Sequence, residues 1–221
     1  MVEKLVPGIW RIDFGGVNAY IIDDADGVTL VDAGMPWHAD RLTTALRTVA
    51  SGPAAVERVL LTHYDFDHAG SFGRVAGLDA PVYAAEPDAG YLTGSARPPW
   101  RSRKGLFQRV AGVGVRPPAG PVRTVSDGEI LGKFTAIHTP GHTPGHLAFL
   151  HEELSTVVLG DLVRGHNGGF DPSPWLLSAD MTAVRRSIRD VADRASGMEI
   201  GLVGHGPPVV GNAGKRLQHL H

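Results

Sequence analysis

The sequence predicts an α/β protein built as a sandwich of sheets and helices. Short apolar segments typical of strands occur in both halves of the 221-residue chain, and segments with helical spacing lie between them. The 29 glycines and 16 prolines suit a fold with many loops at strand ends, because these residues supply turn geometries. With 43% hydrophobic residues, the chain can fill one sizeable core. We therefore expect a single domain over residues 1–221.

The first third of the chain predicts a strand meander followed by a helix. Residues 8–14 alternate between apolar and polar side chains, and segments 17–22 and 28–31 are further strands separated by polar turns. The stretch 36–50 spaces its apolar residues at helical intervals, with Pro36 suited to a first turn. The next predicted strand, 56–61, leads directly into a segment rich in histidine and aspartate.

The second half predicts further strands and a helix of about residues 180–195. The predicted strands lie near Val82 and Val122 and at 134–138, 147–150, 156–159 and 200–203. Several of them end beside a histidine or an aspartate.

Composition limits the possible functions. No apolar run approaches the roughly 18 residues of a membrane span, and a formal charge of -2 lacks the basic character of a nucleic-acid binder. The absence of cysteine excludes disulfides, thiolate metal sites and cysteine nucleophiles, which leaves the 11 histidines and the carboxylates as ligands. We expect a cytoplasmic protein with a small-molecule substrate and with no nucleic-acid or membrane partner. Its oligomeric state stays open.

Four groups of polar residues follow predicted strands. The first places His63, Asp65, Asp67 and His68 within six residues, where imidazole and carboxylate can converge on a metal ion. The others are a Pro-Gly-His loop with His142, the Gly-Asp pair ending at Asp161, and a Gly-His-Gly segment around His205.

In this order, the four groups resemble the metallo-β-lactamase superfamily of metal-dependent hydrolases, whose fold is a four-layer αββα sandwich. The family pattern is His-x-His-x-Asp-His after a strand, then a ligand histidine, an aspartate and a Gly-His-Gly segment. The resemblance implies two divalent metal ions, zinc first, with manganese or iron as alternatives. One metal would be held by His63, Asp65 and His142, the other by Asp67, His68 and His205. Asp161 would bridge them.

Asp65 departs from the family pattern, which has histidine there. With two divalent ions, three carboxylates and a bridging hydroxide, the charges sum to zero, whereas a histidine would leave one positive charge. We expect a weaker Lewis acid and a preference for harder ions. Two alternatives stay open: Asp65 points away and only the second metal binds well, or the site is degenerate and the protein merely binds a ligand.

The resemblance implies hydrolysis of an ester, thioester or lactone, in which Asp67 both ligates a metal and orients the nucleophile or transfers its proton. Three alternatives remain: a di-iron redox protein related to flavodiiron proteins, a β-lactamase-like amide hydrolase, and a non-catalytic metal-binding protein.

A basic segment, residues 89–126, contains no acidic residue and predicts a lid-like insertion, with a helix at about 101–110. If it attracts an anionic substrate, Arg101 and Arg103 are candidate contacts. Arg164 and His166, which follow Asp161, are further candidates, and His146 is a candidate support for the His142 loop.

Overall fold

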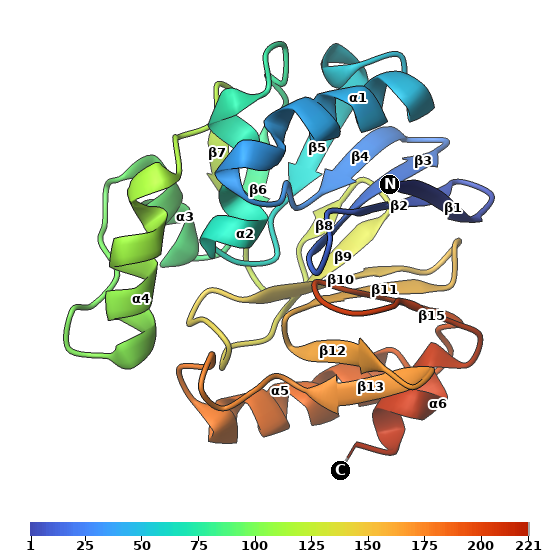
Figure 1. Ribbon diagram of the computed structural model, residues 1–221. Coiled ribbons are helices and arrows are strands. Elements are labelled where there is room, and N and C mark those ends of the chain that lie inside the picture. Colours follow the sequence, from blue (N-terminus) through green and yellow to red (C-terminus); the bar gives the residue numbers. More distant parts are fainter. Residues whose placement is uncertain (221) are drawn as a thin grey trace. The chain divides into compact units, whose positions relative to one another are not determined.

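The computed structural model describes residues 1–220 and divides the chain into two compact units, Met1–Thr124 and Val125–His221. Each unit has its own sheet and its own helices (Figure 1). The predicted α/β class is confirmed within each unit, and the prediction of a single domain stays a prediction. Among the described residues, no helix combines the length and apolarity that crossing a membrane requires.

The first unit contains a seven-stranded sheet in sequence order. Its strands are β1 (Val2–Val6), β2 (Ile9–Asp13), β3 (Asn18–Asp24), β4 (Gly27–Val31), β5 (Val56–Leu60), β6 (Val82–Ala84) and β7 (Val122–Thr124). Strands β1 to β4 pair antiparallel, whereas β4 to β7 pair parallel. The carboxyl ends of the four parallel strands therefore lie along one edge of the sheet.

Helices of the first unit are α1 (Ala39–Val49), α2 (Phe66–Ala69), α3 (Asp88–Thr93) and α4 (Arg103–Ala111), with short 3-10 turns at Pro36–His38, Pro53–Ala55, Phe72–Arg74 and Gly112–Gly114. The apolar face of α1 buries Leu42 and Leu46 in the same core cluster as Ile21 and Leu30 of the sheet. The periodicity of residues 36–50 thus reflects one helix face against a sheet.

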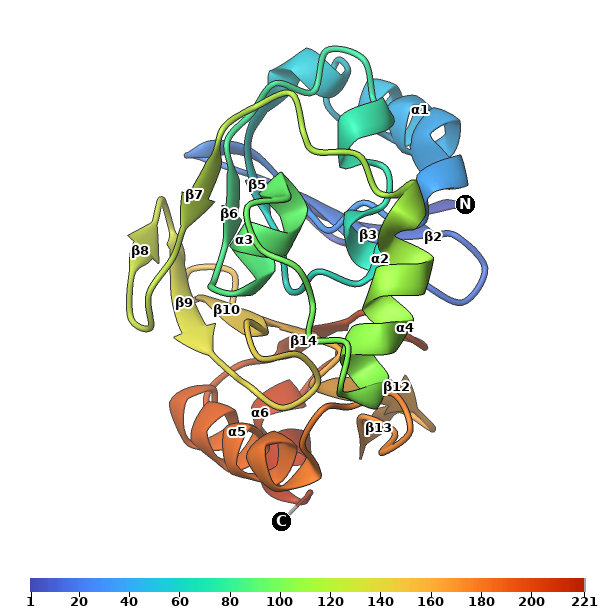
Figure 2. The ribbon, with the colours of Figure 1, turned by 90° about the vertical axis from the view of Figure 1, so that its left-hand side faces the viewer.

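The second unit contains a six-stranded sheet in the order β15-β14-β11-β10-β9-β8. Its strands are β8 (Ile130–Leu131), β9 (Phe134–His138), β10 (Leu147–His151), β11 (Thr156–Gly160), β14 (Ile200–Val203) and β15 (Val209–Val210). Strands β12 (Val163–His166) and β13 (Gly169–Pro172) form a separate hairpin. Helices α5 (Met181–Arg194) and α6 (Ala213–Gln218) lie side by side (Figure 2) and share a core with β10 and β11.

The longer predicted elements are found close to their expected bounds. Predicted strands 134–138 and 200–203 coincide with β9 and β14, and α4 confirms the helix expected at about 101–110. The sequence did not indicate the two-residue strands β8 and β15, because pairing with a neighbour rather than local pattern defines them. The segment 89–126 also ends in β7, so its last residues belong to the sheet.

Candidate metal centre

Three parallel strands of the first unit bring acidic and imidazole groups to one sheet edge. Asp32 follows β4, the His63 to His68 segment follows β5, and Asp88 follows β6 after a short loop. The Oδ1 atom of Asp32 accepts a hydrogen bond from the backbone nitrogen of Thr62 at 2.9 Å. The Oδ2 atom of Asp88 accepts one from the backbone nitrogen of Tyr64 at 2.8 Å. Carboxylates on both neighbouring strands thus hold the start of the motif.

Both motif histidines are oriented through their Nδ1 atoms. The Nδ1 of His68 lies 2.8 Å from Oδ2 of Asp32, and the Nδ1 of His63 lies 3.0 Å from Oγ1 of Thr62. The Thr62 hydroxyl also donates to Asp32 Oδ2 at 2.8 Å. Because these contacts use Nδ1, Nε2 is the ligating atom of each ring in any metal complex. The two rings lie together, with centroids 4.1 Å apart.

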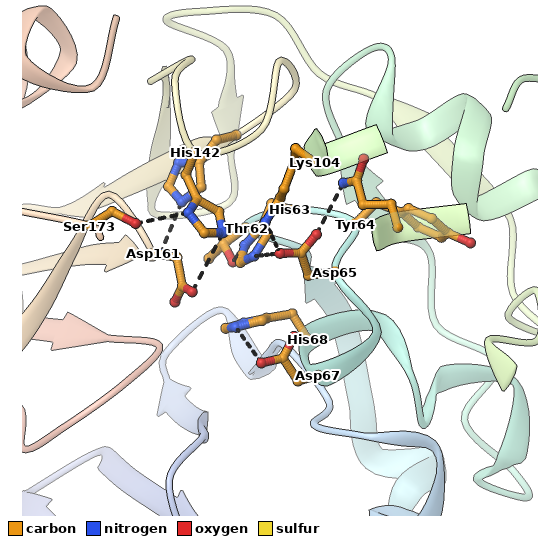
Figure 3. A network of polar contacts seen from close by, with 12 residues as sticks. Thr62, His63, Tyr64, Asp65, Asp67, His68, Lys104, His142, Asp161 and Ser173 are labelled. Carbon is orange, nitrogen blue, oxygen red and sulfur yellow. Dashed lines mark hydrogen bonds and ion pairs between the residues drawn. The ribbon is translucent and has the colours of Figure 1, made fainter. Parts of the chain in front are cut away.

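Asp65 is held by α4 in addition to its place in the motif. The Lys104 ammonium donates to its Oδ2 atom (Figure 3). The Gln108 side-chain amide donates to its Oδ1 atom at 3.0 Å. The same Oδ2 atom lies 3.4 Å from Nε2 of His63. The sequence predicted Asp65 as a metal ligand, and the structure adds two protein donors to that carboxylate.

Asp67 lies in the first turn of α2, next to the histidine that ends the motif. Its Oδ2 atom is 3.9 Å from Nε2 of His68. Within the first unit, the structure therefore brings together all four predicted ligands of the motif: His63, Asp65, Asp67 and His68.

The second unit brings its three predicted ligands to one sheet edge in the same way. Strands β11 and β14 are parallel, so Asp161 and His205 follow neighbouring carboxyl ends. The loop with His142 connects β9 to β10, each antiparallel to its neighbour, which places it at that edge. The Oδ2 atom of Asp161 lies 3.6 Å from Nε2 of His142 and 3.2 Å from Nε2 of His205. One carboxylate oxygen is thus close to both histidines.

Hydrogen bonds fix the orientation of these groups as well. The Nδ1 of His142 lies 2.9 Å from Oγ of Ser173, which again leaves Nε2 to face the carboxylate (Figure 3). His146, the predicted loop support, accepts a hydrogen bond at Nε2 from the backbone nitrogen of Asp161 at 3.1 Å. Its Nδ1 atom lies 2.7 Å from Oγ1 of Thr139. His146 therefore connects the histidine loop to the start of the Asp161 turn.

A close backbone approach positions the loop with His205. The backbone nitrogen of Gly165 in β12 donates to the carbonyl of His205 at 2.9 Å. A Cβ atom at Gly165 would lie 1.8 Å from the carbonyl oxygen of Pro207. Only glycine fits between the hairpin and this loop.

A cavity of about 210 Å³ lies beside the ligands of the second unit. Its lining includes Asp161, His205 and Arg164. Arg164, a predicted substrate contact, also approaches Asp171 at 3.6 Å. The other candidate, His166, lies 3.0 Å from the same carboxylate and outside this lining.

A second cavity, of about 390 Å³, lies within the first unit beside α3 and α4. Its polar lining includes Tyr64, Tyr91, Arg97, Gln108 and Arg109. Burial raises the pKa of Tyr64 and of Tyr91, so both phenols stay protonated donors at neutral pH.

The predicted anion contacts Arg101 and Arg103 are exposed and absent from the lining of this cavity. The guanidinium of Arg101 lies 5.0 Å from the ring centroid of Trp100.

The sequence analysis did not identify several residues of the site, among them Asp32, Lys104, Gln108 and Ser173. The sequence pattern could have indicated Asp32, because this residue follows an apolar strand as Asp161 does. Lys104 and Gln108 are spaced four residues apart, which places them on one helix face. Nothing local indicated that this face meets Asp65, 39 residues away from Lys104.

The donor set fits a divalent transition metal. Buried imidazoles with fixed Nδ1 atoms and nearby carboxylates are the usual ligands of zinc, iron and manganese. Carboxylate and hydroxyl partners behind ligating histidines are also typical of such sites.

The chain is similar in sequence to one protein superfamily and to several curated relatives. A sequence model described as the metallo-beta-lactamase superfamily matches residues 12–206. Among curated relatives, the uncharacterized protein YobT of Bacillus subtilis is 28% identical over 212 residues, covering 90% of this chain and 88% of the relative. An atrochrysone carboxyl ACP thioesterase of Passalora fulva is 24% identical and covers 99% of this chain. This chain spans only 59% of that thioesterase.

Solved structures show the same likeness. The metallo-beta-lactamase family protein TTHA1429 of Thermus thermophilus has a TM-score of 0.74 and 27% identity, covering 98% of this chain and 79% of that one. TTHA1623, solved in a di-iron-bound form, has a TM-score of 0.68 and 30% identity, covering 90% of this chain and 92% of that one.

Proposed function

Because the chain belongs to the metallo-β-lactamase superfamily and is a metal-dependent hydrolase, we propose that it hydrolyses an ester, thioester or lactone at a binuclear metal centre. The family match covers residues of both units. Membership of this family and the solved structures confirm the predicted αββα fold.

The proposed centre has two ligand sets. Membership of the superfamily implies that one metal would be held by His63, His142 and Asp161, and the other by Asp67, His68 and His205. The observation that carries this proposal is the carboxylate of Asp161, whose Oδ2 atom lies close to Nε2 of both His142 and His205. An oxygen shared by two histidine nitrogens has the geometry expected of a bridging ligand.

Two divalent ions bound there would lower the pKa of water and polarise an acyl carbonyl. Side chains of the protein would orient the nucleophile, transfer its proton and hold the histidine rings in place. We assign to Asp67 the orientation of the nucleophile and the transfer of its proton, as a carboxylate in a metal centre can perform. Its Oδ2 atom lies 3.9 Å from Nε2 of His68, a residue of the same ligand set. The contacts of Asp32 and Ser173 keep the histidine rings in the orientation that presents Nε2.

The substrate is a small acyl compound that carries an acidic group. Arg164 supports this choice, since this residue lines the same cavity as Asp161 and His205. The thioesterase relative supports a thioester as the first substrate class to examine. For the metal, the ligand chemistry favours zinc, and the di-iron-bound relative adds iron as the main alternative.

The test combines metal analysis with a substrate screen. We expect two equivalents of zinc or iron per chain, and turnover of acyl thioesters, esters or lactones that stops on chelation and returns on metal addition. Asp67→Asn should lower turnover by at least about a hundredfold. Fewer than one metal equivalent, together with no activity restored by added metal, would contradict the proposal.

Arg164→Gln tests the acidic group of the substrate. This variant should raise the KM of carboxylate-bearing acyl substrates by about tenfold and leave that of neutral ones within about twofold. Arg103→Gln, which removes an exposed charge from α4, is the matched control. An equal effect of Arg164→Gln on the KM of both substrate types would contradict the proposal that the substrate carries an acidic group.

A further inference from the structure

We propose that Asp65 and Lys104 form a neutral pair that takes the place of the neutral second histidine in the family motif. Asp65 then serves as a positioning residue that binds α4 and is not a metal ligand. This inference rests on the metal centre proposed above and is independent of its substrate.

Both oxygens of the Asp65 carboxylate have donors from one helix face. Lys104 donates to Oδ2, and Gln108, one turn later in α4, donates to Oδ1 at 3.0 Å. The side chains of Asp65 and Lys104 are each only 5% exposed. A buried carboxylate and a buried ammonium are each costly alone, so each is stable here because the other is present.

The pair also changes the charge balance at the metal centre. A carboxylate in place of histidine removes one positive charge from the ligand environment, and the Lys104 ammonium restores it. The total then equals that of the usual histidine motif. The predicted weaker Lewis acid therefore does not follow, because the charge of Asp65 is compensated by protein.

A metal ion and Lys104 would compete for the same carboxylate oxygen. The Oδ2 atom of Asp65 accepts from Lys104 and also lies 3.4 Å from Nε2 of His63. A divalent ion bridging His63 and Asp65 would bring two cationic groups to that oxygen and repel the ammonium. The ligand set of His63, His142 and Asp161 avoids this conflict.

Other contacts hold α4 against the motif and fix the position of Lys104. Phe107 of α4 packs edge-on against Phe66, the residue between the two motif aspartates, with ring centroids 6.0 Å apart. Ser102 caps the helix by accepting from the backbone nitrogen of Gly105 at 3.0 Å. A Cβ atom at Gly105 would lie 2.0 Å from the carbonyl oxygen of Pro99, so this turn packs tightly.

The test is a double-mutant cycle on metal binding, measured by titrating the metal-free protein with zinc. Asp65→Asn leaves an uncompensated ammonium and should weaken zinc binding by about tenfold. Lys104→Met leaves an uncompensated carboxylate and should strengthen it or leave it unchanged. The double variant D65N/K104M should bind two ions with Kd values within about threefold of the wild type.

Restoring the family motif gives a second, independent measurement. Asp65→His alone keeps a buried ammonium beside a neutral ring and should weaken zinc binding. D65H/K104M should recover two ions with wild-type affinity. Lys133→Met is the matched control, because Lys133 pairs with Glu153 at a site where both side chains are exposed. It should change neither affinity nor stoichiometry.

The attachment of α4 to the motif can also be measured without metal, by the rate at which a protease cleaves the helix. Thermolysin cleavage near Phe107 should be faster in D65N, in K104M and in the double variant than in K133M, because each of the three loses the contact that binds α4.

Three results would overturn the inference. The first is loss of one zinc ion, or a Kd more than tenfold weaker, in D65N/K104M, which would make Asp65 a metal ligand. The second is a zinc affinity of D65N equal to that of the wild type, which would show that Asp65 does not compensate the Lys104 ammonium beside the metal centre. The third is a wild type that binds no metal, which would also overturn the proposed function, whereas the first two leave that function standing.

Discussion

Asp32 connects two motif residues that the sequence presents as separate ligands. Its carboxylate accepts from the backbone and hydroxyl of Thr62 and contacts Nδ1 of His68, and Thr62 in turn contacts His63. Asp32 itself has a φ of 56°. Asparagine tolerates that backbone region, so an isosteric substitution removes charge without forcing a new backbone conformation.

Asp32→Asn should therefore lower zinc affinity by about 10- to 100-fold, because it weakens the partner behind a ligating histidine. Zinc titration of the metal-free protein measures this. Asp40→Asn, at the exposed start of α1, should behave as wild type. Unchanged affinity in D32N would show that the negative charge of Asp32 does not contribute to zinc binding.

His38 gives the protein a pH-dependent stability that is separate from the metal ligands. Its ring stacks on Phe14 with centroids 4.3 Å apart, and its Nδ1 atom accepts from the backbone nitrogen of Met35 at 3.2 Å. Burial and then the Arg41 guanidinium lower the pKa of His38 below its ordinary value of 6.5. In the folded state the ring therefore binds protons less readily than in the unfolded chain.

Stability contributed by His38 should be present above the unfolded pKa of 6.5 and be lost as pH falls toward the lower folded value. The urea midpoint of the wild type should fall more between about pH 7.5 and about pH 5.5 than that of His38→Gln. His219→Gln, at an exposed position, should retain the wild-type fall. If the urea midpoints of all three proteins fell equally with pH, His38 would not be the source of the pH-dependent stability.

At the scale of elements, the carboxyl ends of parallel strands determine where the predicted ligands lie within each unit. In the first unit these are β4 and β5, and in the second they are β11 and β14. The β12–β13 hairpin adds the close approach of Gly165 to the loop with His205.

Gly165→Ala should push this loop away and lower zinc affinity by about tenfold or remove one ion, because the added Cβ would lie 1.8 Å from the Pro207 carbonyl. Zinc stoichiometry measures the effect. Gly169→Ala is the control on the same hairpin, since its Cβ would meet only an ordinary contact at 3.8 Å. Equal effects of the two variants would indicate a general loss of hairpin structure.

Helix α5 depends on its first turn. The Asp180 carboxylate accepts from the backbone nitrogens of Thr182 and Ala183 at 2.8 and 3.1 Å. Asp180→Ala should cost about 1 kcal/mol of unfolding free energy in urea denaturation. Asp190→Asn, which alters an exposed pair with Arg194, should cost less than about 0.5 kcal/mol. A smaller loss of unfolding free energy in D180A than in D190N would contradict the assignment of Asp180 as the N-cap that stabilises α5.

For the whole molecule, we expect the proposed metal binding to stabilise the folded chain. At a free metal concentration of about a hundred times Kd, binding stabilises a folded protein by about 2.7 kcal/mol. Chelation should therefore lower the Tm of the wild type in a thermal melt. His142→Ala should have a lower Tm at the start and respond less to the chelator. No response in the wild type would count against a structural contribution from metal.

The fold could be predicted wherever local pattern reflects burial. The alternation in β2 and the helical spacing in α1 each record one face against a core. Strands β8 and β15 have two residues each, so no local pattern distinguishes them, and α3 lies in a segment expected to be a lid. Their structure depends on the neighbours with which they pair or pack.

The sequence by itself determined which donors are available, because the absence of cysteine and the order of His63, Asp67, His68, His142, Asp161 and His205 leave imidazole and carboxylate as the predicted metal ligands. It also marked Asp65 as the exceptional position. Only the tertiary structure decided what surrounds that carboxylate. Lys104 reaches Asp65 through the packing of α4 against the motif, and this contact between residues distant in sequence determines the charge beside the predicted metal ligands.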